Sequence, residues 1–142
     1  MLINEIGFTE LEKAISETGK SLLDYLAPAI GKVYVVAITR NECSACEKQK
    51  PNLNGLAKNV VEKHGSKVGF ARIHVNRPPE SEEESLRSKD VFGHYFYPTN
   101  LILLRTVDRG AIELYRSISP GMDELKKNVE IAVKIAIAIE KG

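Results

Sequence analysis

The chain has 142 residues, of which 43% are hydrophobic, so it is long enough to bury a substantial core. Its formal net charge of +1 argues against a nucleic-acid partner, because phosphate binding draws on an excess of lysine and arginine. Two cysteines in a chain of this length do not form a framework of structural disulfides. We expect a single domain over residues 1–142.

The N-terminal thirty residues are too charged for a signal peptide. The acidic and basic side chains that interrupt any apolar segment there are Glu5, Glu10, Glu12, Lys13, Glu17, Lys20 and Asp24. A second apolar run, residues 131–139, contains Lys134 and is too short to cross a bilayer. We therefore expect a cytoplasmic protein without a membrane partner.

The N-terminal segment predicts a short edge strand followed by a helix. Leu2 and Ile3 supply the strand, and Thr9 to Glu12 has the spacing of a capping box, which opens a helix. One apolar face then follows, with Gly19 as a weak point and Pro28 as the stop: Leu11, Ala14, Ile15, Leu22 and Leu26.

Both cysteines lie where a predicted strand becomes a predicted helix. Residues 33–38 form an apolar run rich in β-branched side chains, typical of a buried strand. After Cys46, apolar residues recur at helical spacing until Gly65, and Pro51 predicts a kink in this helix. The Cys43-Ser44-Ala45-Cys46 stretch therefore opens a helix.

A helix N-terminus favours a thiolate. Unpaired backbone N–H groups and the positive end of the helix dipole lower a cysteine pKa from about 8.5 toward about 3.5–7.5. Cys43 is then a nucleophile near neutral pH, and Cys46, one helical turn later, is placed to resolve the mixed disulfide that Cys43 forms.

The C-terminal half predicts a strand, a helix, a hairpin and a last helix. Residues 67–76 form the strand, which Arg77-Pro78-Pro79 ends, and the acidic run of residues 80–85 starts a helix that reaches Phe92. A strand over 100–104, a turn at 107–110 and a partner strand over 111–116 make the hairpin. This order indicates an α/β domain with layers of helices on a sheet.

The last helix, expected from about Asp123 to Lys141, carries more apolar residues than one buried face needs. The expected inward positions are Leu125, Val129, Ala132, Val133, Ala136 and either Ile137 or Ile139. Ile131, Ile135 and Ile137 cannot all join them, so either the helix is deeply buried or it forms a homodimer interface.

The order of elements, the Cys-x-x-Cys motif, Pro51 behind it and Pro98 ahead of the hairpin resemble the thioredoxin-like family. The resemblance implies a central mixed β-sheet flanked by helices, here with a longer segment before the cis-proline and an extended C-terminal helix. It implies that Cys43 attacks, that Cys46 resolves and that Pro98 is the cis-proline. The backbone around Tyr97, Pro98 and Thr99 would bind an extended substrate peptide.

The chain differs from thioredoxins proper at residues next to the first cysteine, between the two cysteines and six positions before the first cysteine. Glu42 replaces a tryptophan, Ala37 replaces a buried carboxylate used in proton transfer, and Ser44-Ala45 replaces Gly-Pro. Glu42 should raise the pKa of Cys43, whereas Arg40 and the helix end should lower it, so these residues tune the redox potential in opposite directions. The resemblance therefore implies the general thiol–disulfide exchange reaction for this chain. It does not imply the role of a housekeeping thioredoxin.

The favoured function is a thiol–disulfide oxidoreductase without a cofactor, which acts on protein disulfides and is served by a thiol- or NADPH-linked reductase. One alternative is a peptide-binding scaffold with little redox activity, which the losses at positions 37 and 42 favour. Another is a metal-linked dimer through Cys43 and Cys46. A structural zinc site needs four ligands, which the cysteine pair with His64 and His74 does not supply at a common spacing, so we expect no metal site within one chain. We assign no catalytic role to the histidines, of which His94 is expected nearest the site.

Overall fold

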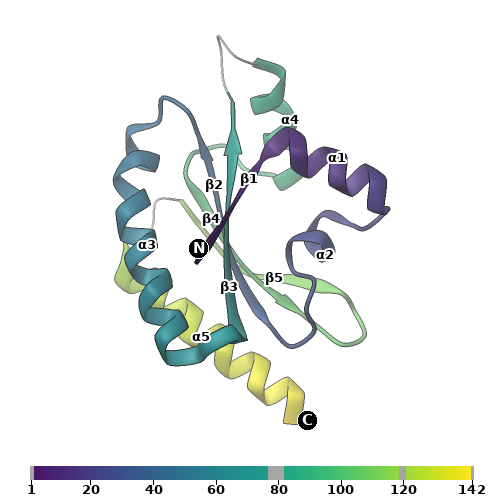
Figure 1. The fold of residues 1–142 in the computed structure, drawn as a ribbon, viewed down its shortest axis with the longest axis vertical. Coiled ribbons are helices and arrows are strands. Elements are labelled where there is room, and N and C mark those ends of the chain that lie inside the picture. The colour runs from purple at the N-terminus through teal and green to yellow at the C-terminus, as the bar shows by residue number, and fades with distance from the viewer. Residues whose placement is uncertain (1, 77–81, 119–120, 142) are drawn as a thin grey trace.

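The structure is a computed structural model that describes residues 2–76, 82–118 and 121–141, with only the backbone described at residue 82. Five strands form one sheet in the order β1-β3-β2-β4-β5 (Figure 1). β3 pairs in parallel with β1 and β2, whereas β4 is antiparallel to β2 and to β5. The strands are β1 (Ile3–Gly7), β2 (Val33–Arg40), β3 (Val68–Val75), β4 (Thr99–Arg105) and β5 (Ala111–Ile118). The expected mixed sheet is confirmed.

Helices cover both faces of this sheet (Figure 1). α3 (Ser44–His64) and α5 (Met122–Lys141) lie on one face, and a short 3₁₀ turn (Gly65–Lys67) links α3 to β3. α1 (Phe8–Thr18), α2 (Leu22–Leu26) and α4 (Glu82–Phe92) lie on the other. Within the described ranges, every helix is too short or too polar to span a membrane.

The central strand β2 is apolar from Val33 to Ile38 because both of its faces are buried. Val33, Val35 and Ala37 belong to the core beneath α3 and α5. Val36 and Ile38 belong to the core on the opposite face, beneath α1 and α4. This explains why the sequence shows a continuous apolar run here rather than an alternating one.

Two expectations for the N-terminal segment are wrong. α1 begins at Phe8 with Gly7 as its N-cap, and no side chain caps it, so Thr9 lies inside the helix and forms no capping box. The single expected helix is two, because Gly19 ends α1 with φ of 70° and donates its N–H to the carbonyl of Ile15. A left-handed glycine after the last turn is a common helix stop.

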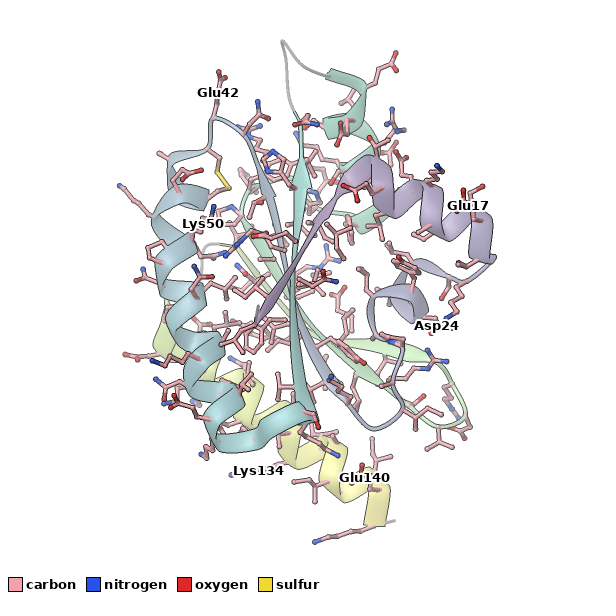
Figure 2. All side chains as sticks on the ribbon, in the orientation of Figure 1. Glu17, Asp24, Glu42, Lys50, Lys134 and Glu140 are labelled. Atoms are coloured by element: carbon pink, nitrogen blue, oxygen red, sulfur yellow. A yellow bond between two sulfur atoms is a disulfide. The ribbon has the colours of Figure 1, made fainter. Side chains whose placement is uncertain are left out.

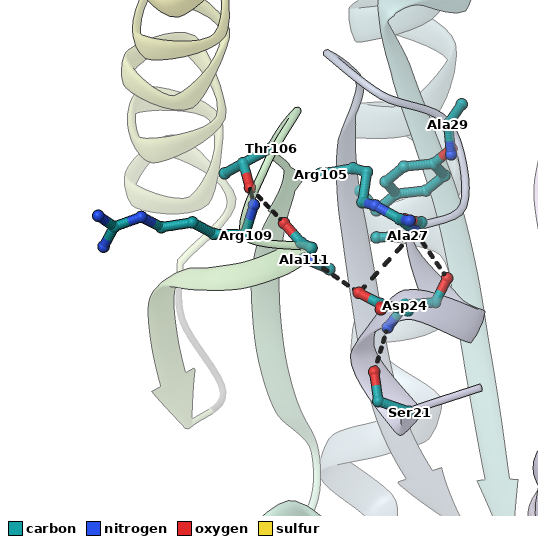
Figure 3. Close-up of polar contacts among 10 residues, drawn as sticks. Ser21, Asp24, Ala27, Ala29, Arg105, Thr106, Arg109 and Ala111 are labelled. Carbon is teal, nitrogen blue, oxygen red and sulfur yellow. Dashed lines mark hydrogen bonds and ion pairs between the residues drawn. The ribbon is translucent and has the colours of Figure 1, made fainter. Parts of the chain in front are cut away.

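α2 begins at Leu22 and is capped by Ser21, whose hydroxyl accepts the N–H of Asp24 at 3.3 Å. The Asp24 carboxylate then accepts the N–H of Ala111 at 2.7 Å and lies 3.8 Å from the guanidinium of Arg105 (Figure 3). Arg105 also donates to the carbonyl of Ala27 at 3.2 Å. These contacts attach α2 to the β4–β5 hairpin. The single helix expected from the sequence does not account for them.

The last helix is buried on one face only. The expected inward residues Leu125, Val129, Ala132, Val133 and Ala136 are buried. Ile137 and Ile139 are 39% and 44% exposed, so placing either of them inward is wrong. Ile131 and Ile135 are also exposed, which rules out the deeply buried helix and leaves the homodimer interface as a prediction.

The helix expected to end at Phe92 does end there, and α3 ends at His64 with Gly65 after it, as expected. The break at Arg77-Pro78-Pro79, the first residues of the acidic run at Glu80-Ser81, and Ser119-Pro120 lie outside the described residues.

Candidate functional site

Cys43 and Cys46 form a disulfide at the N-terminus of α3, with their Cα atoms 5.2 Å apart. Figure 2 shows the sulfur–sulfur bond at this end of the helix. Cys43 is the N-cap residue, and its Sγ accepts the N–H of Cys46 at 3.2 Å. The two residues are only 8% and 5% exposed. The sulfur of Cys43 therefore occupies the position where a helix stabilises negative charge.

The turn that delivers Cys43 passes through Glu42, which has a φ of 52°. A left-handed conformation is uncommon for glutamate, and here it reverses the chain between the end of β2 and the start of α3. Glu42 is exposed, and Figure 2 shows its side chain pointing away from the body of the protein. Of the dipeptide between the cysteines, Ser44 is exposed and Ala45 half-buried.

The Tyr97–Pro98 segment faces the disulfide from the start of β4. The peptide bond between Tyr97 and Pro98 is cis, and the carbonyl oxygen of Tyr97 lies 3.7 Å from the Sγ of Cys43. Thr99 begins β4 and donates its hydroxyl to the carbonyl of Phe96 at 2.7 Å. Of the three expected peptide-binding positions, 97 to 99, the structure thus shows a contact with the cysteine pair at Tyr97, and the other two follow it into β4.

The ring of Tyr97 is held from three sides. The guanidinium carbon of Arg40 lies 5.0 Å from the ring centroid, an arrangement that permits a cation–π interaction. The imidazole of His94 meets the ring edge-on, with centroids 4.8 Å apart, and the Tyr97 hydroxyl is 3.2 Å from that of Ser85 on α4. Arg40 thus supports the tyrosine whose carbonyl faces the disulfide.

His94 is buried and touches Tyr97, and no contact of its ring with the sulfur atoms is found among the described residues. Its Nδ1 lies 3.1 Å from the carbonyl oxygen of Phe96, and its Nε2 lies 2.9 Å from the Ser88 hydroxyl. Burial lowers the pKa of His94, which favours the neutral ring. Because the Phe96 carbonyl can only accept, Nδ1 is the donor, and Nε2 of a neutral ring then accepts from Ser88. His64 instead pairs with Glu130 on α5, at 2.9 Å.

Two buried amides near the cysteines were not predicted from the sequence. Asn100 on β4 is fully buried and donates its Nδ2 to the Oε1 of Gln49 on α3 at 2.9 Å. Asn100 is directly opposite Ala37 in the β2–β4 pairing. The signal that could have revealed this pair is an asparagine opening an otherwise apolar strand, together with a glutamine three residues after Cys46 on the same helix.

Hollows of the surface also lie beside and away from this site. One of about 260 Å³ is lined in part by His94, Phe96 and Thr99, on the side of β5. Another of about 580 Å³ lies between the N-terminal strand, α2 and the start of β3, and none of its lining residues belongs to the cysteine site. Across the described parts of the chain, no group of three or more His, Cys, Asp or Glu side chains is arranged to hold a metal ion.

The sheet order, the disulfide at the start of α3 and the proline that opens β4 define a domain with the thioredoxin fold. No family model and no curated protein sequence matches this chain. Solved thioredoxin structures do match it. A thioredoxin from Nicotiana alata is 21% identical, with a TM-score of 0.58 over 91% of this chain and 92% of its own.

Two further matches have similar values. A thioredoxin from Fasciola hepatica is 18% identical, with a TM-score of 0.55 over 92% of this chain and 97% of its own. A thioredoxin f2 in complex with ferredoxin:thioredoxin reductase is 14% identical, with a TM-score of 0.58 over 92% and 94%. The chain therefore has the thioredoxin fold.

Proposed function

We propose that this chain is a thiol–disulfide oxidoreductase that acts on protein disulfides through Cys43 and Cys46. The observation that carries the proposal is the disulfide at the N-terminus of α3, where the Sγ of Cys43 accepts a backbone N–H of the helix. When the disulfide is open, the same N–H and the helix dipole stabilise a thiolate on Cys43. In the reduced form, the sulfur of Cys43 is therefore a nucleophile. In the oxidised form, the same sulfur is bonded to Cys46 and cannot attack a substrate.

In the reducing direction, the Cys43 thiolate attacks one sulfur of a substrate disulfide. A bond forms between Cys43 and that sulfur, the substrate's own S–S bond breaks, and the departing sulfur takes a proton from solvent. Cys46 then loses its proton and attacks Cys43, which forms the Cys43–Cys46 disulfide and releases the second substrate sulfur as a thiol. Two electrons pass from the cysteine pair to the substrate, and the reverse sequence oxidises a dithiol.

The substrate polypeptide is proposed to bind along Tyr97, Pro98 and Thr99. The carbonyl of Tyr97 lies beside Cys43, so a peptide hydrogen-bonded to this backbone would place its own sulfur near the attacking atom. Contacts from Arg40 and His94 hold the Tyr97 ring, which supports the view that this backbone is preorganised.

The residues next to Cys43 are proposed to tune the stability of its thiolate. Glu42 is exposed, so water screens its carboxylate and weakens its unfavourable effect. Arg40 is half-buried against Tyr97, so water screens its positive charge less. We therefore expect Arg40 to affect the Cys43 thiolate more strongly than Glu42 does. Ser44 and Ala45 contribute no charge, so the balance lies between Glu42 and Arg40.

A reductase that delivers electrons to the oxidised form is the proposed partner. The thioredoxin f2 of similar fold was solved with ferredoxin:thioredoxin reductase, which supports a reductase in general for this chain. A cytoplasmic location and a homodimer through the exposed isoleucines of α5 stay predictions, and the second is tested by measuring the molecular mass in solution.

The proposal is tested by reduction of insulin with dithiothreitol as the electron source, comparing the wild type with Cys43→Ser and Cys46→Ser. We expect no activity for Cys43→Ser, whereas Cys46→Ser should accumulate a mixed disulfide with the substrate because it cannot resolve it. Activity that survives Cys43→Ser would refute the assigned roles. Peptide binding without any disulfide exchange would favour the scaffold alternative.

A further inference from the structure

Gln49 and Asn100 form a buried polar pair beneath the first turns of α3. Gln49 is 7% exposed and Asn100 is fully buried, in a region otherwise filled by apolar side chains. Their one mutual hydrogen bond uses the Nδ2 of Asn100 and the Oε1 of Gln49. Burying two amide side chains costs free energy that burying two apolar side chains does not cost. Packing alone therefore does not explain why these two residues are amides.

Asn100 retains an unused acceptor. Its Oδ1 is the one fully buried side-chain oxygen without a hydrogen-bond partner in the described part of the chain. Buried polar atoms of this kind are uncommon in folded proteins, and a partner that exists in another state of the protein is one explanation.

Cys46 is the group whose hydrogen-bonding capacity changes with redox state. In the disulfide its sulfur has no proton to donate, whereas the reduced thiol is a donor. Cys46 and Gln49 are three residues apart on α3 and both are buried, so they share the helix face that lies on the sheet. The amide of Asn100 is bonded to that same face through Gln49.

We propose that the Gln49–Asn100 pair positions the resolving cysteine: once the disulfide opens, the Oδ1 of Asn100 accepts the thiol proton of Cys46 as a hydrogen bond, directly or through one water. This inference rests on the proposed function. Asn100 is a positioning residue in this account, and Gln49 orients it by occupying its Nδ2 so that Oδ1 is left free.

The arrangement determines where the proton of Cys46 goes. Neither amide ionises, and Ala37, which faces Asn100 across the strand pairing, cannot accept a proton either. A hydrogen bond from the neutral thiol to a neutral acceptor favours the thiol over the thiolate. When Cys46 attacks Cys43, its proton therefore passes to solvent, and the pair does not act as a base.

The charged residue opposite Ala37 on β3 already has partners of its own. Arg72 is opposite Ala37 on β3, and its guanidinium binds the carboxylate of Glu5 and lies 3.4 Å from the Oδ1 of Asn54. α5 packs apolar residues, including Leu125 and Val129, into this core. Other charged or titratable side chains around the start of α3 are all retained in the variants below: Arg40, Glu42, Glu47, Lys48, Lys50, His74 and Tyr97.

The test introduces a carboxylate at each amide in turn and follows the ionisation of Cys46 alone. In a Cys43→Ser background, Cys46 is the only thiol, and its thiolate is titrated by ultraviolet absorbance. Asn100→Asp and Gln49→Glu are compared with Asn52→Asp, which makes the same chemical change at an exposed position of α3. The measurement needs no turnover, so it is separable from the insulin assay.

We expect Asn100→Asp and Gln49→Glu each to lower the thiolate fraction of Cys46 at a given pH by about tenfold, because a nearby carboxylate opposes ionisation of the thiol. Their titrations should also become two-step, since two interacting groups then share the curve. Asn52→Asp should stay within about twofold of the parent because water screens its charge.

Folded variants whose Cys46 titration equals that of the parent would overturn the proposal, even if their stability to urea had fallen. If Asn100→Asp does not fold, Gln49→Glu decides the question alone, since Gln49 lies nearer the surface.

Discussion

The N-cap role of Cys43 can be measured separately from its chemistry. Cys43→Ser and Cys43→Ala both abolish the disulfide, and both fit a residue that is 8% exposed. They differ in one respect, because the serine hydroxyl can accept the N–H of Cys46 as the Sγ of Cys43 does, whereas alanine cannot. Exchanging serine for alanine at an N-cap costs about 1 kcal/mol, with a range of about 0.5–2 kcal/mol.

We therefore expect Cys43→Ser to exceed Cys43→Ala in free energy of unfolding by about 1 kcal/mol, or by about 2–4 °C in Tm for a chain of this length. Urea denaturation at pH 7 under reducing conditions measures the difference, with Cys46→Ser and Cys46→Ala as a matched pair that leaves the cap intact. Equal stability of the two Cys43 variants would refute the view that position 43 caps α3, and with it the reason for a stabilised thiolate.

Three further predictions concern the supporting structure. Because burial lowers the pKa of His94, the unfolded chain binds a proton near pH 6.5 before the folded chain does. Wild-type stability should therefore fall as pH drops below this value, by more than in His94→Gln, and parallel urea curves from pH 5 to 8 would contradict this. The hydrogen bond from Ala111, aided by Arg105, lowers the pKa of Asp24 despite partial desolvation. Asp24→Asn should therefore be less stable than the wild type at neutral pH, and the difference should vanish as pH falls through the folded pKa; a deficit that persists in acid would exclude this origin. On α5, Leu125→Ala should cost about 2–5 kcal/mol in unfolding free energy, whereas Ile131→Ala should stay within about 0.5 kcal/mol. A large loss for Ile131→Ala in the monomer would contradict the assignment of the buried face.

The sequence was sufficient for the elements around the cysteines because local pattern and tertiary burial agree there. The apolar run of β2, the helical spacing after Cys46 and the stop at Gly65 each indicate the structure observed. The strand that follows Pro98 and its hairpin partner were also expected, with ends one or two residues short. Helix and strand ends depend on capping and pairing contacts that a periodic pattern does not contain.

The N-terminal error arose from a motif that local sequence satisfies and the fold does not use. Thr9 and Glu12 have capping-box spacing, but Phe8 is fully buried against the sheet and so belongs to the helix itself. Packing of one aromatic side chain outweighs the contribution of about 1 kcal/mol from a cap. Gly19 was recognised as a weak point, and its left-handed conformation makes it a stop.

The sequence indicated the reactive residues of the candidate site, but not the contacts that hold these residues in place. Cys43, Cys46 and the Tyr97–Thr99 backbone were expected together from the resemblance, and in the structure the two cysteines are bonded and the Tyr97 carbonyl faces Cys43. The contacts of Tyr97 with Arg40 and His94, and of Gln49 with Asn100, join residues between 3 and 57 positions apart in the chain. Such contacts depend on strand register, which a single sequence does not specify.

The two outer strands of the sheet affect how copies of this protein meet. Among the described residues, β1 and β5 each have one row of backbone N–H and C=O groups that no other strand pairs with. Glu5 lies on β1, and Glu113 and Arg116 form an ion pair on β5, so a neighbouring molecule that extended the sheet would have to desolvate charges at either border. Charged borders of this kind oppose the growth of a continuous intermolecular sheet and protect a crowded solution of the protein from aggregation.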